Sequence, residues 1–294
     1  MWSRLSDGVR FVLSAERRLP EERRLSMDST ATQEELEAGR GYEALFVPAI
    51  FEPWTKHLIE GAGVEEGSHV LDVACGSGVL ARHALAHSGQ SGRVVGVDPA
   101  PGMIAAAREV EPGIEWVLAS AESLDFGDAT FDCVVSQFGM MFFKDRIKAA
   151  SEMYRVMKPG GRLAISVWNS LANNPAYGDI IAVLDEQVSI AAGDALRLPY
   201  SLGDCDAVID ALTQSGFVDI KTETRTEQAR FPSCRTMVEA ELRGWLPLFD
   251  INLNEDKITD VLIKSDEKLA KYADQSGEAV FPTSAHIVTT QKPQ

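Results

Sequence analysis

The sequence predicts a doubly wound α/β fold, in which helices cover both faces of a mostly parallel sheet. Two observations predict it. Short, almost entirely apolar runs alternate with amphipathic segments, and the first of these runs ends in the glycine loop Gly76-Ser77-Gly78. Near-continuous apolar strands are typical of parallel sheets, because both faces of such a sheet are buried. With 294 residues, 45% of them hydrophobic, the chain is long enough for one large domain with an insertion.

The predicted elements alternate regularly as far as Trp168. Residues 34–62 carry apolar side chains at three- and four-residue steps, which predicts helices that Pro48 and Pro53 break into short pieces. After them we expect strands in "GSHVLDVACGSG", "GRVVGVDPA", "IEWVLAS", "FDCVVSQFG" and "RLAISVW". The helices between them are expected in "VLARHALAHSG", "PGMIAAAREV" and "DRIKAASEMYRVM", the last of which is ended by Lys158-Pro159-Gly160-Gly161.

Beyond Trp168 the alternation lapses, which predicts a helical cap inserted into the fold. A helix that ends at Gly216 precedes "VDIKTETRTEQARF", whose polar and apolar residues alternate as in an exposed antiparallel strand. The predicted organisation is an extension over 1–33, N-terminal helices and a ligand-binding core over 34–168, a cap insertion over 169–203, a core helix and strand over 204–233, a helical cap over 234–275, and a last core strand with its tail over 276–294.

The first 26 residues differ from the rest in composition. They contain six arginines and no lysine, and they also contain acidic residues, which are unusual in an organelle presequence. We expect a disordered or loosely helical extension, or a true start at Met27.

Charge and cysteine usage count against several classes of partner and site. The chain has 28 Lys and Arg against 44 Asp and Glu, a net charge of −16, and such a surface repels the phosphate backbone of nucleic acids. No apolar run reaches the roughly 18 residues that a membrane span needs. The four cysteines form no C-x-x-C pair, which favours free thiols in the cytoplasm over disulfides or a metal site.

The glycine loop after the first strand is the predicted binding site. Ligands of parallel sheets lie beyond the carboxyl ends of the strands, and glycines let the backbone approach them closely. Asp98 follows Gly78 by 20 residues, where a carboxylate can accept both hydroxyls of a ribose. A dinucleotide fits these features too, since Ala81 is a permitted variant of its third glycine. Asp72, however, would repel a pyrophosphate and suits a cationic amino or sulfonium group.

These motifs, taken in order and spacing, carry a resemblance to a known family. "VLDVACGSG", "VVGVDPA", "AESLDF", "FDCVVSQFGMMFF" and "RVMKPGGRLAISVW" resemble the motifs of class I S-adenosylmethionine-dependent methyltransferases, in particular the small-molecule, methyltransferase type 11-like branch. The resemblance covers about residues 41–168, and "FPTSAHIVTT" resembles the closing strand of such enzymes. It implies a seven-stranded Rossmann-like sheet whose last strand is antiparallel.

The resemblance also implies which residues bind the cofactor S-adenosylmethionine. The first motif would hold its methionyl part, the acid after the second strand its ribose, and the loops after the second and third strands its adenine. These residues are, in that order, Asp72, Ala74, Gly76 and Gly78; Asp98; and Pro99, Met103, Ser120, Ala121 and Glu122. The backbone of Gln137 would face the cofactor's amino group, and Tyr42 would close over the methionyl end. Family members often have Asp in place of Ser120, whose hydroxyl binds an amine more weakly.

The segments that differ among such enzymes are expected to bind the methyl acceptor. Their large side chains indicate an apolar or aromatic acceptor, with candidate contacts at Phe46, Phe51, Trp54, Phe138, Met141, Phe142 and Trp245. Glu241 and Arg243 could orient a polar group there, but a position on a solvated helix face is the favoured interpretation. The run Asn173–Tyr177 is similar to the N-P-P-Y motif of amide and ring-nitrogen methyltransferases, yet it follows the wrong strand and is predicted to be a loop.

Methyl transfer needs a dedicated base only when the acceptor must lose a proton. None of the five histidines is expected at the glycine loop, and His57 is the least remote, so no catalytic residue is assigned. The leading hypothesis is transfer to O, N, S or C of a small molecule, by a chain that is compatible with a homodimer. The alternatives are a methyltransferase for protein or RNA, and a non-catalytic cofactor-binding protein.

Overall fold

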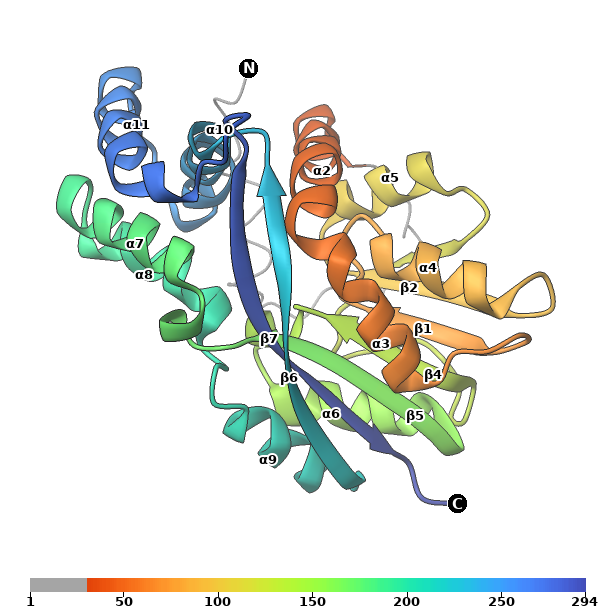
Figure 1. Ribbon diagram of the computed structural model, residues 1–294. Helices are drawn as coiled ribbons and strands as arrows, with labels where there is room; N and C mark the ends of the chain where they lie inside the picture. Colours follow the sequence, from red (N-terminus) through yellow and green to blue (C-terminus); the bar gives the residue numbers. More distant parts are fainter. Residues whose placement is uncertain (1–30) are drawn as a thin grey trace.

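A seven-stranded sheet in the order β3-β2-β1-β4-β5-β7-β6 forms the centre of the molecule in the computed structural model, which describes residues 31–294 (Figure 1). The first five strands are parallel, and β7 runs antiparallel to both of its neighbours. The predicted fold class is therefore confirmed. The strands are β1 His69–Val73, β2 Arg93–Asp98, β3 Glu115–Leu118, β4 Phe131–Gln137, β5 Met157–Trp168, β6 Val218–Phe231 and β7 Ala279–Gln291.

The helices of the first half follow the predicted order. A capping box of Thr32 and Glu35 starts the first of them, and Pro48 and Pro53 lie in the short turns that divide it from the next. The elements are α2 Gln33–Phe46, the π turn η2 Val47–Phe51, the 3₁₀ turn η3 Glu52–Trp54, α3 Thr55–Ala62, α4 Val79–Ser88, α5 Pro101–Val110, the 3₁₀ turn η4 Met140–Phe142 and α6 Arg146–Val156.

One predicted boundary is wrong. The sequence pattern predicts a helix in "DRIKAASEMYRVM" that runs through Met157 and ends at the Lys158-Pro159-Gly160-Gly161 turn. In the structure this helix, α6, ends at Val156. Met157 already pairs with Phe131 of β4, so β5 begins before the glycines instead of after them. Pairing with a neighbouring strand outweighs the local helical pattern here.

The second half supplies the cap and the two outer strands. Its elements are η5 Leu171–Asn173, α7 Pro175–Gln187, α8 Ile190–Arg197, η6 Leu198–Tyr200, α9 Asp206–Gln214, α10 Cys234–Ala240, the π turn η7 Glu241–Trp245, η8 Leu246–Phe249, α11 Glu255–Leu269 and η9 Ala270–Tyr272. Helix α7 packs against α8 and α11, and α10 packs against α11. Figure 1 shows these four helices gathered at one end of the long β6–β7 pair, and α2 on the other side of that pair.

The described residues contain no helix long and apolar enough to span a membrane. The four cysteines are buried and free. The arginine-rich residues 1–26 and the candidate start at Met27 lie outside the described part of the chain, and of the predicted extension over 1–33 only the last three residues are described, where α2 begins.

Candidate functional site

The loop between β1 and α4 lies where the order of the strands reverses, the position at which open parallel sheets bind ligands. Its backbone is left-handed at Ala74, Gly76 and Gly78, with φ of 58°, 55° and 91°. A Cβ atom on Gly78 would lie 2.2 Å from the ring of Trp116, so glycine is required there by both conformation and space. The loop therefore presents bare backbone at the carboxyl end of the parallel strands.

Asp98 ends the neighbouring strand β2 and binds this loop. Its Oδ2 accepts a hydrogen bond from the Gly76 N–H at 2.9 Å, and its Oδ1 accepts one from the Ala100 N–H, also at 2.9 Å. Burial raises the pKa of Asp98 to about 6, although both N–H donors favour the charged form. Because a carboxylate offers about four lone pairs, each oxygen can still accept a ligand hydroxyl.

Asp72, on β1, is a buried acid of a different kind. It is 1% exposed, and neither oxygen accepts a hydrogen bond from the described residues. Burial raises its pKa well above the usual range, and the nearby Ala81 amide moderates this shift without completing a hydrogen bond. An unpartnered buried carboxylate costs free energy, so this position favours a cationic or hydrogen-donating ligand.

More buried polar atoms without partners lie on the loop and on β4, which pairs with β1 at Asp72 and Val135. Within the described chain, the hydroxyls of Ser77 and Ser136 and the Oε1 of Gln137 make no hydrogen bond. Buried polar atoms normally have a partner, so atoms without one on these elements are candidate ligand contacts.

The predicted adenine contacts follow β2 and β3, which are adjacent in the sheet. Ala121 is buried, and the hydroxyl of Ser120 is hydrogen-bonded to the carboxylate of Glu122. A ligand amine at this position would therefore meet a serine and a glutamate that are already paired. Of the other two predicted contacts after β2, Pro99 is exposed and Met103 is half-buried.

Tyr42, on α2, covers the glycine loop. Its ring carbon Cε1 lies 3.7 Å from the place where a Cβ atom of Gly76 would be. Its ring stacks on Phe46 at 5.9 Å and on Phe51 at 5.3 Å between centroids. Gln137 fixes this arrangement to β4, since its Nε2 donates to the Phe51 carbonyl at 2.9 Å. The N-terminal helices thus bring aromatic rings to the site.

These rings begin a closed series of aromatic contacts, here called the aromatic circuit. Consecutive ring centroids are 5.3 to 6.4 Å apart, and the contributing elements are α2, η2, β5, α7, η6, β6 and β7. Its members, in order around the circuit, are Tyr42, Phe46, Phe231, Phe281, Tyr177, Tyr200, Trp168 and Phe51. The circuit joins the glycine-loop side of the sheet to the cap.

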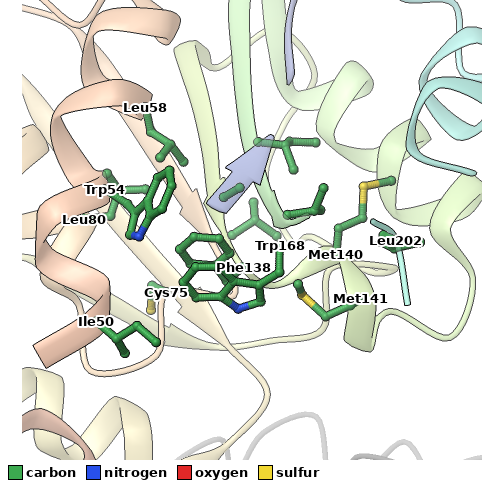
Figure 2. Packing of buried hydrophobic residues seen from close by; sticks show 14 of the residues in the cluster. Ile50, Trp54, Leu58, Cys75, Leu80, Phe138, Met140, Met141, Trp168 and Leu202 are labelled. Atoms are coloured by element: carbon green, nitrogen blue, oxygen red, sulfur yellow. The ribbon is translucent and has the colours of Figure 1, made fainter. Parts of the chain in front are cut away.

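Some of the predicted acceptor contacts are buried side chains that are not members of the circuit. Trp54 has no exposed surface and packs edge-on against Phe138 and Trp168, 5.8 Å from each, and Phe138 in turn stacks on Trp168 at 3.7 Å (Figure 2). Met141 is 2% exposed. Trp54 and Met141 thus have almost no exposed surface in this structure, and their contact with an acceptor stays a prediction.

Two other predicted contacts, Phe142 and Trp245, are half-buried and lie against each other at 5.8 Å between centroids. The indole N–H of Trp245 donates to the Ala195 carbonyl at 2.9 Å, which ties η7 to α8. The pair connects the turn after β4 with the cap, outside the aromatic circuit.

Glu241 does not lie on the solvated helix face that the sequence predicts. It is 7% exposed and accepts a hydrogen bond from the Tyr177 hydroxyl at 3.2 Å. Burial raises its pKa to about 7. The expectation is correct for Arg243, which pairs with Glu239 and Glu255 at 2.8 Å. The two residues differ because positions two apart on a helical turn face opposite sides, so one lies toward the interior and the other toward its ion-pair partners.

His57 and the segment from Asn173 to Tyr177 have structural partners. The Nε2 of His57 lies 2.7 Å from the Oε1 of Glu227 on β6, so a hydrogen bond holds this ring. The Asn174 amide donates to the carbonyls of Asn169 and Ser284 and holds the turn that precedes α7. The same turn sends Tyr177 into the aromatic circuit.

Comparison with known proteins matches the first half of the chain. Residues 71–165 fit the family model described as a methyltransferase domain. Among curated proteins, the ubiquinone/menaquinone biosynthesis C-methyltransferase UbiE of Enterobacter sp. (strain 638) is 42% identical over 118 residues, which are 38% of this chain and 47% of that protein. UbiE of Escherichia coli O1:K1 / APEC is 41% identical over the same length. The chain thus matches about half the length of these relatives.

Solved structures share the fold over more of the chain. Phosphoethanolamine N-methyltransferase 2 of Haemonchus contortus, solved in complex with S-adenosyl-L-methionine, has a TM-score of 0.56 and 20% identity, covering 90% of this chain and 58% of that one. A structure described as a putative methyltransferase from Bacillus halodurans has a TM-score of 0.53 and 21% identity, covering 82% and 99%.

Proposed function

We propose that this chain, which carries a class I S-adenosylmethionine-dependent methyltransferase domain, transfers the methyl group of that cofactor to a small, apolar or aromatic acceptor. The observation that carries the proposal is the pairing of two buried acids with one glycine loop. Asp98 holds the Gly76 N–H, and Asp72 keeps both oxygens free of hydrogen bonds from the described residues.

The residues at the loop suit the cofactor's functional groups. A carboxylate without a partner at Asp72 attracts a cationic amino group or sulfonium, and Asp98 has lone pairs left for the ribose hydroxyls. Left-handed backbone at Ala74, Gly76 and Gly78 lets a ligand approach the main chain. We further propose that Pro99, Met103, Ser120, Ala121 and Glu122 flank the adenine, and that the Gln137 backbone and Tyr42 flank the methionyl end.

The aromatic circuit supports an apolar or aromatic acceptor. Aromatic side chains bind flat apolar molecules through large contact areas and preferred ring geometries. Phe46 and Phe51 are only half-buried, so they retain surface for a ligand, whereas most of the circuit's other rings are buried and form its fixed walls. We therefore place the acceptor between the glycine loop and the cap, against the circuit.

The bound cofactor supplies an electrophilic methyl group, and the protein supplies alignment and exclusion of water. Tyr42 spans both halves of the site, because its ring covers Gly76 and stacks on Phe51. It is thus placed to hold the acceptor in line with the methyl group. The predicted cap segments 169–203 and 234–275 would exclude water from the acceptor side. They contribute Tyr177, Tyr200 and Glu241.

Charge and cysteine chemistry support the rest of the proposal. A net charge of −16 disfavours nucleic acid as the acceptor, and four free, buried thiols suit the cytoplasm. A gel shift with RNA at low salt tests the first point: tight, salt-sensitive binding would favour the alternative of an RNA methyltransferase.

Calorimetry with S-adenosylmethionine and with NADH tests the cofactor. We expect the first to bind and the second not to bind. Asp98→Ala should weaken the binding of S-adenosylmethionine by about 1.5–3 kcal/mol, the range for hydrogen bonds to a charged group. Tight NADH binding would contradict the proposal. A screen of small phenols, amines and thiols for release of S-adenosylhomocysteine then tests transfer itself.

A further inference from the structure

Glu241 is a buried carboxylate in the cap with no counter-charge. It is 7% exposed, and the described residues give it one hydrogen bond, from Tyr177, and no cationic partner. The neighbouring Arg243 is committed to Glu239 and Glu255. Removing a charge from water without a partner is costly, and proteins usually avoid it. Glu241 also lies in a π turn, a feature that is frequent at functional sites.

The surroundings of Glu241 connect it to the proposed acceptor site. Its partner Tyr177 belongs to the aromatic circuit, stacked against Tyr200 at 5.7 Å and edge-on to Phe281 at 6.3 Å. Burial is the main cause of the raised pKa of Tyr177, and the carboxylate of Glu241 raises it further. Tyr42, which covers the glycine loop, lies opposite Tyr177 in the circuit, with three rings between them on either side.

We propose that Glu241 and the aromatic faces beside it bind an ammonium group of the acceptor, which makes the acceptor an arylalkyl or similarly apolar amine. This inference rests on the proposed function and names its substrate class. A carboxylate next to aromatic faces is complementary to an organic cation, because the rings attract the charge and the carboxylate neutralises it. The acidic net charge of the chain also favours a cationic acceptor over an anionic one.

The same carboxylate has a place in the reaction. An ammonium nitrogen has no free electron pair, so it must lose a proton before it can attack. An oxygen of Glu241 takes that proton, and the freed nitrogen pair then forms a bond to the methyl carbon while the carbon–sulfur pair leaves with sulfur. The product is a methylated ammonium ion, the sulfonium becomes a neutral thioether, and Glu241 returns its proton to water after release.

The groups around Glu241 leave it as the titrating acid between about pH 6 and pH 8. Tyr177 from α7 is hydrogen-bonded to it and Tyr200 from η6 packs on Tyr177, and burial raises the pKa of both phenols, so both stay neutral in this range. On its own helix, Arg243 is held charged by Glu239 and Glu255. Amine binding should therefore strengthen as the pH rises from 6 to 8.

The test uses the full chain loaded with S-adenosylhomocysteine and a panel of arylalkyl amines, each paired with its alcohol, such as 2-phenylethylamine with 2-phenylethanol and tryptamine with tryptophol. By calorimetry at pH 8, we expect at least one amine to bind about tenfold more tightly than its alcohol, as for a charged hydrogen bond. This preference should shrink at pH 6 and vanish in Glu241→Gln. Arg243→Gln, on the same turn, is the matched control and should keep it.

The outcomes separate this inference from the proposed function. A wild-type chain that does not bind S-adenosylmethionine contradicts both. A chain that binds it but prefers no amine in the panel, or whose preference survives in Glu241→Gln, contradicts only the ammonium site. Loss of S-adenosylmethionine affinity in Glu241→Gln would assign the carboxylate to the cofactor and overturn the inference. If that variant does not fold, the wild-type pH profile decides: amine binding that is flat from pH 6 to 8 overturns it.

Discussion

Asp72 and Glu241 are both buried acids, but they belong to regions that are built differently. Asp72 lies in the parallel sheet beside a loop of bare backbone, and its oxygens have no hydrogen-bond partner within residues 31–294. Glu241 lies in the helical cap among side chains, and it has a tyrosine partner. The matched methyltransferase domain covers the first region and ends before the second.

The two halves of the proposed site are therefore formed in different ways. The sheet side is formed by main-chain conformation within a few short loops, so its tolerance to substitution is low and its ligand chemistry is fixed. The cap side is formed by aromatic rings from elements far apart in the sequence, including three strands of the sheet, so its shape depends on how these elements pack together. Four substitutions test this contrast, beginning with the largest expected effect.

Gly78→Ala should be the most damaging. A left-handed alanine costs about 1–2 kcal/mol, and the collision with Trp116 adds about 1–3 kcal/mol. Urea unfolding should show a loss of about 2–5 kcal/mol. The control is Gly277→Ala, which has the same φ of 91° but nothing within 4 Å, so only the conformational cost applies. Equal losses in the two variants would show that the close packing behind the loop has no energetic weight.

Glu241→Gln should stabilise the free protein at high pH. Because the folded-state pKa of about 7 exceeds the ordinary value of 4.5, the folded state holds its proton longer than the unfolded state. The unfolding free energy of the wild type therefore falls as the pH rises from about 4.5 to 7, by up to about 3 kcal/mol. Urea titrations should find the variant more stable than the wild type at pH 8 and similar to it near pH 5. A constant difference across this range would contradict the burial of a charge.

Asp72→Asn should separate stability from binding. The variant removes a buried charge without a partner, so the free protein should be at least as stable at pH 8. Its affinity for S-adenosylmethionine should fall by about 1.5–3 kcal/mol, measured by calorimetry. Unchanged affinity would mean that Asp72 has no ligand contact and would weaken the proposed role of the loop.

Arg243→Gln should have the smallest effect. Its ion pairs with Glu239 and Glu255 lie at the surface of the cap, where such pairs contribute less than about 1 kcal/mol. The loss should diminish further in 1 M salt. A larger loss would indicate that the surface of the cap, and not only its aromatic interior, holds the π turn in place.

The sheet side could be predicted from sequence because its determinants are local. A strand, a glycine loop and an acid after the next strand follow one another within residues 70–98, and each is visible as a short pattern. The structure brings Asp98 to Gly76 as the pattern requires. The boundary at Met157 failed because strand pairing with Phe131, which is distant in sequence, decided it.

The cap side could not be predicted because its determinants are tertiary. Trp168, Tyr177, Tyr200 and Phe281 come together only through the packing of β5, α7, η6 and β7. Trp54 and Met141 are residue types that suit an apolar acceptor site, but tertiary packing buries both in the core. The burial of Glu241 is likewise tertiary, since it depends on the packing of η7 against Tyr177 of α7, which is distant in the sequence.

The place of β7 in the sheet has a consequence for biosynthesis. This strand lies between β5 and β6, and it carries Phe281 into the aromatic circuit. Until residues 279–291 have left the ribosome, β6 has no neighbour in the sheet and the circuit is open. The glycine loop and its two acids, by contrast, are translated within the first third of the chain. A nascent chain can thus assemble its loop early, but the aromatic circuit proposed to bind the acceptor closes only after the last strand of the sheet has been made.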